Sequence, residues 1–245
     1  MLYVIVQGKS LLFHFKEKKG KTMKDKGNFL TRVLFYIGGI VIIALGVGIA
    51  IKSNLGVSPV SSIPYTLDRV AGIETGNATI LFNTFLVFVQ VALLRKEFKP
   101  INFLQILISF LFGKSITLSN ILMGLFPDPA NIGISLLMIL LSTVVIAVGI
   151  FMYVPAGFVP MAPEGTMLAV SKVTGVDFTN IKLIFDISFV IISGVTCLIV
   201  LKELGSVGIG TVAVAVLVGM EIKVLTKFFG KTRDKILKIG AYAVK

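Results

Sequence analysis

The chain has 245 residues, 56% of them hydrophobic, and a mean hydropathy of +0.97. Charged residues make up 15% of the sequence, against about 25% in a typical soluble domain. Six mostly apolar runs follow one another, each near the length that a bilayer core demands. This composition excludes a soluble globular domain and predicts an all-α, polytopic membrane protein. A membrane β-barrel is disfavoured because the runs lack period-two alternation.

The six expected spans are separated by short polar or charged segments. They cover residues 33–51, 78–94, 101–126, 132–154, 183–201 and 207–229. A basic arm, residues 1–30, precedes this single transmembrane domain, residues 31–229, and a basic tail, residues 230–245, follows it. The alternative that translation starts at Met23, which would leave residues 1–22 outside the protein, stays open.

Two Pro- and Gly-rich segments, residues 52–72 and 154–175, follow the first and the fourth span. They are too apolar for ordinary loops, and their prolines and glycines prevent one continuous helix. The residues expected to break the helices are Gly56, Pro59, Pro64, Gly157, Pro160 and Pro163. Paired broken segments in the two halves of a membrane protein indicate a binding site near the bilayer midplane.

The two halves, about residues 31–126 and 132–229, align at a shift of 103 residues, which places Gly72 on Gly175. Three more residues of slack place Ser115 beside Glu221 near the ends of the halves. Each half has three spans, an odd number, so the second half is predicted to be inverted relative to the first. The sequence therefore predicts two inverted three-helix repeats, with broken segments that enter from opposite sides of the membrane.

The net charge of +12 is explained by its distribution. If the N-terminus is cytoplasmic, the inner segments carry 20 of the 24 Lys and Arg residues. The positive-inside rule then places both termini in the cytoplasm of a multi-pass membrane protein. The basic inner face would meet an anionic lipid leaflet, so no nucleic-acid partner is needed to explain the charge.

Residues 44–59, Ala-Leu-Gly-Val-Gly-Ile-Ala-Ile-Lys-Ser-Asn-Leu-Gly-Val-Ser-Pro, and residues 70–76, Val-Ala-Gly-Ile-Glu-Thr-Gly, are similar to a known pattern. They resemble the YczE/YyaS/YitT family of bacterial integral membrane proteins, over about residues 30–228. The resemblance implies a bacterial cytoplasmic-membrane protein of the shorter YczE/YyaS branch, without the soluble C-terminal domain of YitT. Many relatives carry a Trp and an acidic residue where Val60 and Ser61 stand here, so no polar role is inherited at those positions.

Polar residues in the spans and broken segments are the candidates for a solute pathway. They are Asn54, Ser58, Ser61, Ser62, Asn83, Gln90, Lys114, Thr166, Asp186, Ser193 and Glu221. Asn83 and Gln90 share a helix face, as do Asp186 and Ser193 at the equivalent positions. Two interpretations stay open for these stripes, a water-filled cavity or hydrogen bonds between helices.

Lys114 is expected near the middle of the third span, where an unpaired ammonium is costly. It is predicted to lie close in depth to Glu221. The pair would either anchor an anionic solute or gate protons, or it would be a buried ion pair that fixes helix register. Glu164, directly after Pro163, is expected to cap a helix N-terminus.

These features predict a transporter or channel for a small polar or anionic solute. The alternatives are a non-transporting membrane scaffold or accessory protein, and a substrate-binding subunit of a multi-component importer. An enzyme is disfavoured because the sequence lacks the HExxH and GxSxG motifs and has one histidine, His14, and one cysteine, Cys197. No catalytic, metal or cofactor site is predicted, and a homo-oligomer is an open alternative.

Overall fold

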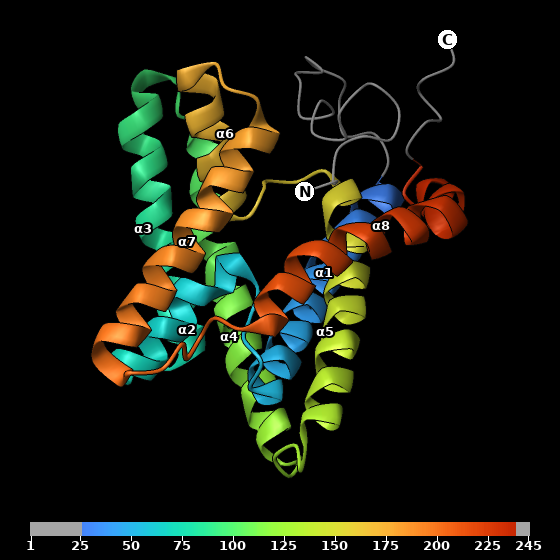
Figure 1. The fold of residues 1–245 in the computed structure, drawn as a ribbon. Coiled ribbons are helices and arrows are strands. Elements are labelled where there is room, and N and C mark those ends of the chain that lie inside the picture. Colours follow the sequence, from blue (N-terminus) through green and yellow to red (C-terminus); the bar gives the residue numbers. More distant parts are fainter. Residues whose placement is uncertain (1–25, 239–245) are drawn as a thin grey trace.

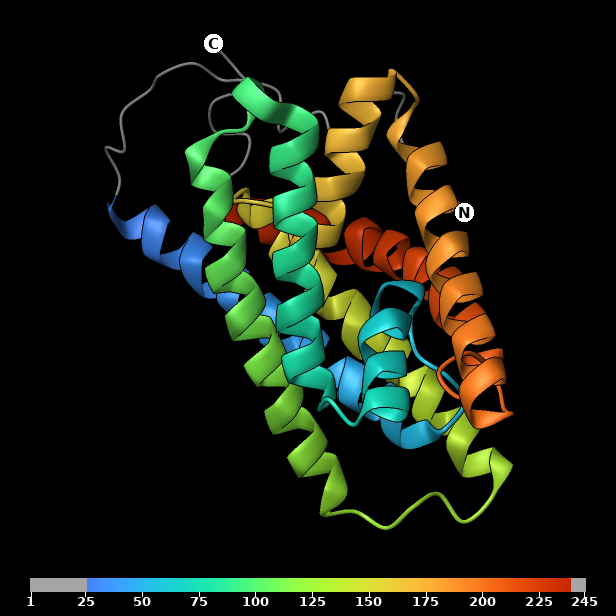
Figure 2. The ribbon, with the colours of Figure 1, turned by 90° about the vertical axis from the view of Figure 1, so that its left-hand side faces the viewer.

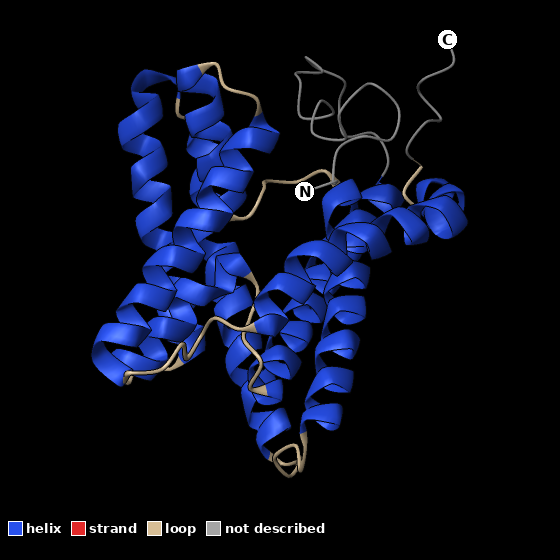
Figure 3. Ribbon diagram, viewed as in Figure 1, coloured by secondary structure: helices blue, strands red, loops and turns tan. Residues whose placement is uncertain are grey.

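The computed structural model describes residues 26–238, with side chains from residue 29 onward. The basic arm expected over residues 1–30 lies almost wholly outside the described residues, as does the end of the basic tail. Every regular element of the described part is helical, and its loops are short (Figure 3).

Six long helices form the body of the protein. They are α1 (Lys26–Ser53), α3 (Thr75–Leu94), α4 (Leu104–Gly124), α5 (Ile132–Tyr153), α7 (Phe178–Leu201) and α8 (Ile209–Ile236). All six are apolar and long enough to cross a bilayer, as predicted. The fifth span begins five residues earlier than expected, because the Asp177 side chain accepts a hydrogen bond from the backbone N–H of Thr179 and caps α7.

Two short helices lie between the long ones, α2 (Pro59–Ala71) and α6 (Ala162–Thr174). Each begins with a proline in its first turn, where no N–H is needed, and ends at a left-handed glycine, Gly72 or Gly175. Pro64, expected to break the chain, instead lies buried inside α2. The helix continues through it and forgoes only the backbone bond that its missing N–H would make.

Three 3-10 turns complete the described part: η2 (Arg95–Glu97) and η3 (Pro100–Phe103) between α3 and α4, and η4 (Val154–Ala156) after α5. We call residues 54–58, between α1 and α2, the first break. Residues 157–161, between η4 and α6, form the second break.

The centre of the molecule is the crossing of α1 and α5, which run antiparallel (Figure 1). A Cβ atom at Gly39 would lie 2.6 Å from the Gly149 carbonyl oxygen, so the two backbones are in direct contact. α4 packs on α1, and α8 packs on α5. α3 lies beside α4 along its length, whereas α8 diverges from α7 (Figures 1 and 2).

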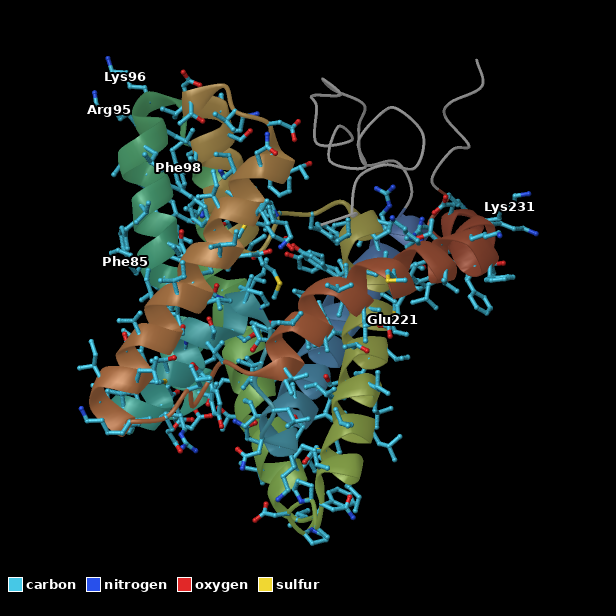
Figure 4. All side chains as sticks on the ribbon, viewed as in Figure 1. Phe85, Arg95, Lys96, Phe98, Glu221 and Lys231 are labelled. Atoms are coloured by element: carbon cyan, nitrogen blue, oxygen red, sulfur yellow. The ribbon has the colours of Figure 1, made fainter. Side chains whose placement is uncertain are left out.

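The short helices pack on the long helices α3 and α7. Val60 and Ile63 of α2 join Met167 and Val170 of α6 in one apolar cluster, which also contains Phe189 of α7. The outer faces of the long helices are apolar and exposed, as lipid contact requires. Phe85, for example, is 62% exposed and points away from the bundle (Figure 4).

Candidate functional site

The short helix α2 is held to α7 by one buried hydroxyl group. Ser62 Oγ shares its one proton between the Pro59 carbonyl oxygen of α2, at 2.7 Å, and the Phe189 carbonyl oxygen of α7, at 3.3 Å, and it accepts a hydrogen bond of 2.9 Å from Ser193 Oγ. Both serines are fully buried. Two of the predicted pathway residues therefore join two helices and satisfy each other.

The short helix α6 is held to α3 in the same manner. Thr166 Oγ1 shares its one proton between the Ala162 carbonyl oxygen of α6, at 2.9 Å, and the Leu86 carbonyl oxygen of α3, at 3.2 Å, and it accepts from Gln90 Nε2 at 3.3 Å. Gln90 also pairs with Gln105 of α4, with amide contacts of 2.9 and 3.2 Å. Our sequence reasoning missed Gln105, although an amide in an apolar run was a usable signal.

Close packing accompanies this amide pair. Gly165 of α6 lies against both glutamines, and a Cβ atom there would come within 2.8 Å of Gln90 Oε1 and 2.9 Å of Gln105 Oε1. A larger residue at this position would force the two amides to shift. Gln90, Gln105 and Thr166 are each about 1% exposed, so this site is a closed polar contact between α3, α4 and α6.

The C-terminal ends of the short helices are tied by ion pairs. Arg69 of α2 binds Glu203 in the loop after α7. Lys172 of α6 binds Glu97 in the turn after α3, at 2.5 Å. Each short helix thus contacts the same region, the segment that follows the middle long helix of the other half.

The second break is organised by two tyrosines. Tyr36 of α1 donates to the Val159 carbonyl oxygen at 2.7 Å. Tyr153 at the end of α5 accepts a hydrogen bond from the Met161 N–H at 2.7 Å and donates to Glu164 Oε2 at 2.9 Å. Glu164 therefore does not cap α6 as expected: no described side chain caps this helix, and the Tyr153 hydroxyl lies between this carboxylate and the Met161 N–H.

Glu164 lies in α6, outside the six long helices. Burial raises the pKa of its carboxyl, while the Tyr153 hydrogen bond and the positive charge of Lys182 oppose this rise. Lys182 of α7 itself donates to Asp186 Oδ2 at 2.7 Å, and Asp186 Oδ1 is buried without a hydrogen-bond partner. The second half thus brings two carboxylates and one ammonium to the region around the start of α6.

The equivalent positions of the first half are uncharged. Val60 or Ser61 corresponds to Glu164, Thr79 to Lys182 and Asn83 to Asp186 at the predicted shift. Asn83 is 3% exposed on α3. Since the first half reaches the same local architecture without these charges, the fold does not require them.

Lys114 and Glu221 do not pair. Lys114 Nζ donates to Asn77 Oδ1 at 2.9 Å, at the level where α3 begins, and its side chain is exposed. Glu221 of α8 accepts from Thr143 Oγ1 of α5 at 2.9 Å, and its second oxygen is buried without a partner (Figure 4). The two residues are separated because α4 packs on α1 and α3, while α8 packs on α5.

The remaining predicted residues lie at the first break. Ser58 caps α2: its Oγ accepts from the Ser61 N–H at 3.3 Å and lies 2.9 Å from Ser61 Oγ. Asn54 is exposed and left-handed, with φ of 58°. It lines an open depression of about 400 Å³ together with Arg69 and Glu203.

A family model described as "Family of unknown function (DUF6198)" matches residues 30–227. The chain belongs to this family. It is similar to the uncharacterized membrane protein YczE of Bacillus subtilis (strain 168), with 24% identity over 202 residues, which cover 81% of this chain and 86% of that protein. No solved structure matches. Membership of DUF6198 and the similarity to YczE confirm the expected YczE-like family and the membrane class.

Proposed function

We propose that this DUF6198 member is an inverted-repeat transporter or channel for a small polar solute. The crossing of α1 and α5 supports the repeat. A Cβ atom at Gly46 would meet Ile146 Cγ1 at 2.5 Å, and one at Gly149 would meet Ile43 Cγ1 at 2.6 Å. Both pairs of equivalent residues are 103 positions apart, and the helices are antiparallel, as expected for contacts that a two-fold axis in the membrane plane would relate.

The observation that carries the proposal is the exchange of short helices between the halves. α2 binds the backbone of α7 at Phe189, and α6 binds the backbone of α3 at Leu86, again 103 positions apart. The ion pairs of Arg69 and Lys172 repeat the exchange at the other ends of the short helices. Short, proline-started helices that cross between inverted repeats are the arrangement from which midplane transport sites are built.

The orientation proposed is the one that the basic residues favour. Arg95, Lys96 and Lys231 lie toward the same end of the bundle, where α1 begins (Figure 4). With that end in the cytoplasm, both termini are cytoplasmic in the bacterial plasma membrane. α2 then enters from outside and α6 from inside.

The solute would meet the charged residues of the second half. Most of the other polar candidates already bind one another, whereas Glu164 has one hydrogen bond and Asp186 has a buried free oxygen. Two carboxylates and one ammonium favour a polar or positively charged solute over an anion. An anionic solute, which the sequence left open, fits these charges less well.

A non-transporting scaffold is the second candidate. The closed contacts of Gln90, Gln105 and Thr166, and of Ser62 with Ser193, are what a dry, packed core would contain. The two functions differ in whether water reaches the short helices.

Cysteine accessibility separates the two candidates. In a Cys197→Ser background, single cysteines at Ser61 and Glu164 would be treated with a membrane-impermeant maleimide from each side of the membrane. Cysteines at the buried neighbours Ser62 and Thr166 serve as matched controls. We expect Ser61→Cys to react from outside, Glu164→Cys from inside, and neither control to react. If the test positions are as inert as the controls, the core is dry and the scaffold is the better description.

A further inference from the structure

α4 and α8 occupy equivalent places in the two halves but pack differently. α4 contacts both α1 and α3, whereas α8 contacts α5 and diverges from α7 (Figures 1 and 2). The connections are comparable: residues 95–103 join α3 to α4, and residues 202–208 join α7 to α8. Chain length therefore does not prevent α8 from lying along α7 as α4 lies along α3.

α8 carries the residues for that contact. Gly113 of α4 packs directly on α3, where a Cβ atom would lie 2.4 Å from the Gly76 carbonyl oxygen, and Ser109 one turn earlier is buried. At the 106-residue shift of these helices, the equivalents are Ala215 and Gly219. Ala215 is exposed in this structure, so part of the small-residue face that α4 buries against its neighbour is left open on α8.

Charge complementarity supports the same contact. Thr117 Oγ1 of α4 donates to Glu74 Oε2, at the start of α3, at 2.9 Å. The equivalent residues of the second half are Lys223 on α8 and Asp177 at the start of α7. Where the first half has a hydrogen bond between Thr117 and Glu74, the second half has a base, Lys223, and an acid, Asp177. No ion pair joins these two residues in the described structure.

The start of α8 is anchored. The Gly210 N–H donates to the Leu55 carbonyl oxygen at 2.8 Å, and the Val57 N–H donates to the Ser206 carbonyl oxygen at 3.3 Å. The far end of α8 is where it diverges from α7 (Figure 1). Movement of α8 toward α7 would therefore pivot about this anchor.

We propose that α8 has a second docking position, on α7, in which Ala215 and Gly219 face the start of α7 and Lys223 pairs with Asp177. In that state the halves exchange conformations, so that α4 leaves α3. The inference rests on the inverted repeat of the proposed function and specifies its conformational change. In the present state α4 packs on α3 while α8 lies away from α7. In the second state α8 packs on α7 while α4 lies away from α3.

Cross-linking tests the exchange. The Lys114 side chain reaches Asn77 in the closed pair α3 and α4, and the equivalent residues in α7 and α8 are Asn180 and Met220, both exposed. In the Cys197→Ser background, the pair N77C/K114C reports the present state and N180C/M220C the second. A bifunctional maleimide whose spacer replaces the length of the lysine side chain is expected to join both pairs within one chain, and a prior N77C–K114C link should abolish formation of the N180C–M220C link in the quadruple variant.

Three outcomes would overturn the proposal. In the first, N77C/K114C cross-links but N180C/M220C never does, and in the second, both links form together in one molecule. In the third, N180C/M220C cross-links between two chains, which would make this face of α7 and α8 a dimer interface. If the cysteines at Ser61 and Glu164 still label from opposite sides in any of these cases, the proposed function stands and only the exchange of helices fails.

A charge variant tests the predicted ion pair without disturbing the cap at Asp177. Lys223→Asp places two carboxylates together in the second state and should lower the N180C/M220C cross-linking yield severalfold, with no effect on N77C/K114C. Lys227→Asp, one turn further along α8, is the matched control and should leave both yields unchanged. Equal effects of the two substitutions would contradict the ion pair.

Discussion

The two breaks of this protein occupy equivalent places in its halves, but they are held by different means. The first break is fixed by backbone: Leu55 and Val57 bond to the chain around the start of α8, and Gly56 and Gly208 lie in contact. The second break is fixed by side chains, the hydroxyls of Tyr36 and Tyr153.

This difference assigns different roles to the breaks. Backbone contacts that only glycine permits cannot be adjusted by protonation, so the first break serves as a rigid anchor. The second break depends on a hydroxyl bound to a carboxylate, a titratable group, so we expect this contact to depend on pH. The first break has no such group in its backbone contacts.

The largest effect is expected from Gly56→Ala. Its φ of 101° is strained for alanine, and the added Cβ atom would lie 2.6 Å from the Gly208 nitrogen. We expect a loss of about 3 kcal/mol or more of stability, measured by unfolding in detergent. Gly157→Ala is the control, because its φ is 75° but its nearest neighbour is 3.8 Å away. It should cost only the backbone strain, about 1 kcal/mol; equal losses would refute the rigid anchor.

Tyr153→Phe should cost about 1–3 kcal/mol, because it leaves both the Met161 N–H and the Glu164 carboxylate without their partner. Tyr36→Phe removes a single hydrogen bond to Val159 and should cost less, about 1 kcal/mol. Thermal unfolding of the two variants beside the wild type measures the difference. A larger loss for Tyr36→Phe would show that the second break is not centred on Tyr153.

The second break should also make stability depend on pH. Burial raises the pKa of Glu164 in the folded state, so between the unfolded and the folded value the native protein binds more protons than the unfolded chain. Stability relative to Glu164→Gln is therefore highest at pH values below the ordinary Glu range and falls as the pH rises through the folded pKa. Unfolding of both proteins over a pH series gives this difference. If the stability of the wild type relative to Glu164→Gln instead rises with pH, then Tyr153 and Lys182 lower the pKa of Glu164 by more than burial raises it.

The smallest effects are expected where the halves match, at the ion pairs of the short helices. Arg69→Gln and Lys172→Gln each remove a pair whose acid is largely exposed, so solvent screens the interaction. Both variants should melt within error of the wild type. A clear loss for one alone would break the equivalence of the two contacts.

The sequence was sufficient for the parts that depend on local composition. Apolar run length placed all six long helices, and the prolines and glycines marked the two segments, residues 52–72 and 154–175, in which α2 and α6 lie. Pro64 was misjudged because a single lost backbone bond does not end a helix that is otherwise well packed.

The contacts of the candidate site depend on which helices pack against each other, and short stretches of sequence do not reveal this. The pairing of Lys114 with Glu221 was wrong because depth in the membrane says nothing of the side of the bundle on which a helix lies. The partners of Glu164 were missed for the same reason: Tyr153 is eleven positions away across a bend. The internal repeat that we propose is a long-range signal of another kind, and the ion pairs of Arg69 and Lys172, which are 103 residues apart, are consistent with it.

The exchange of α2 and α6 between the halves has a consequence for biogenesis. Ser62 contacts the Phe189 carbonyl oxygen, 127 residues later in the chain, and the Leu86 carbonyl oxygen contacts Thr166, 80 residues later. When the ribosome has completed the first three spanning helices, α2 can pack on α3, but its larger contact, with α7, has not yet been synthesised. Neither half is expected to be stable when inserted alone, and the two halves expressed as separate polypeptides should accumulate only when they are produced together.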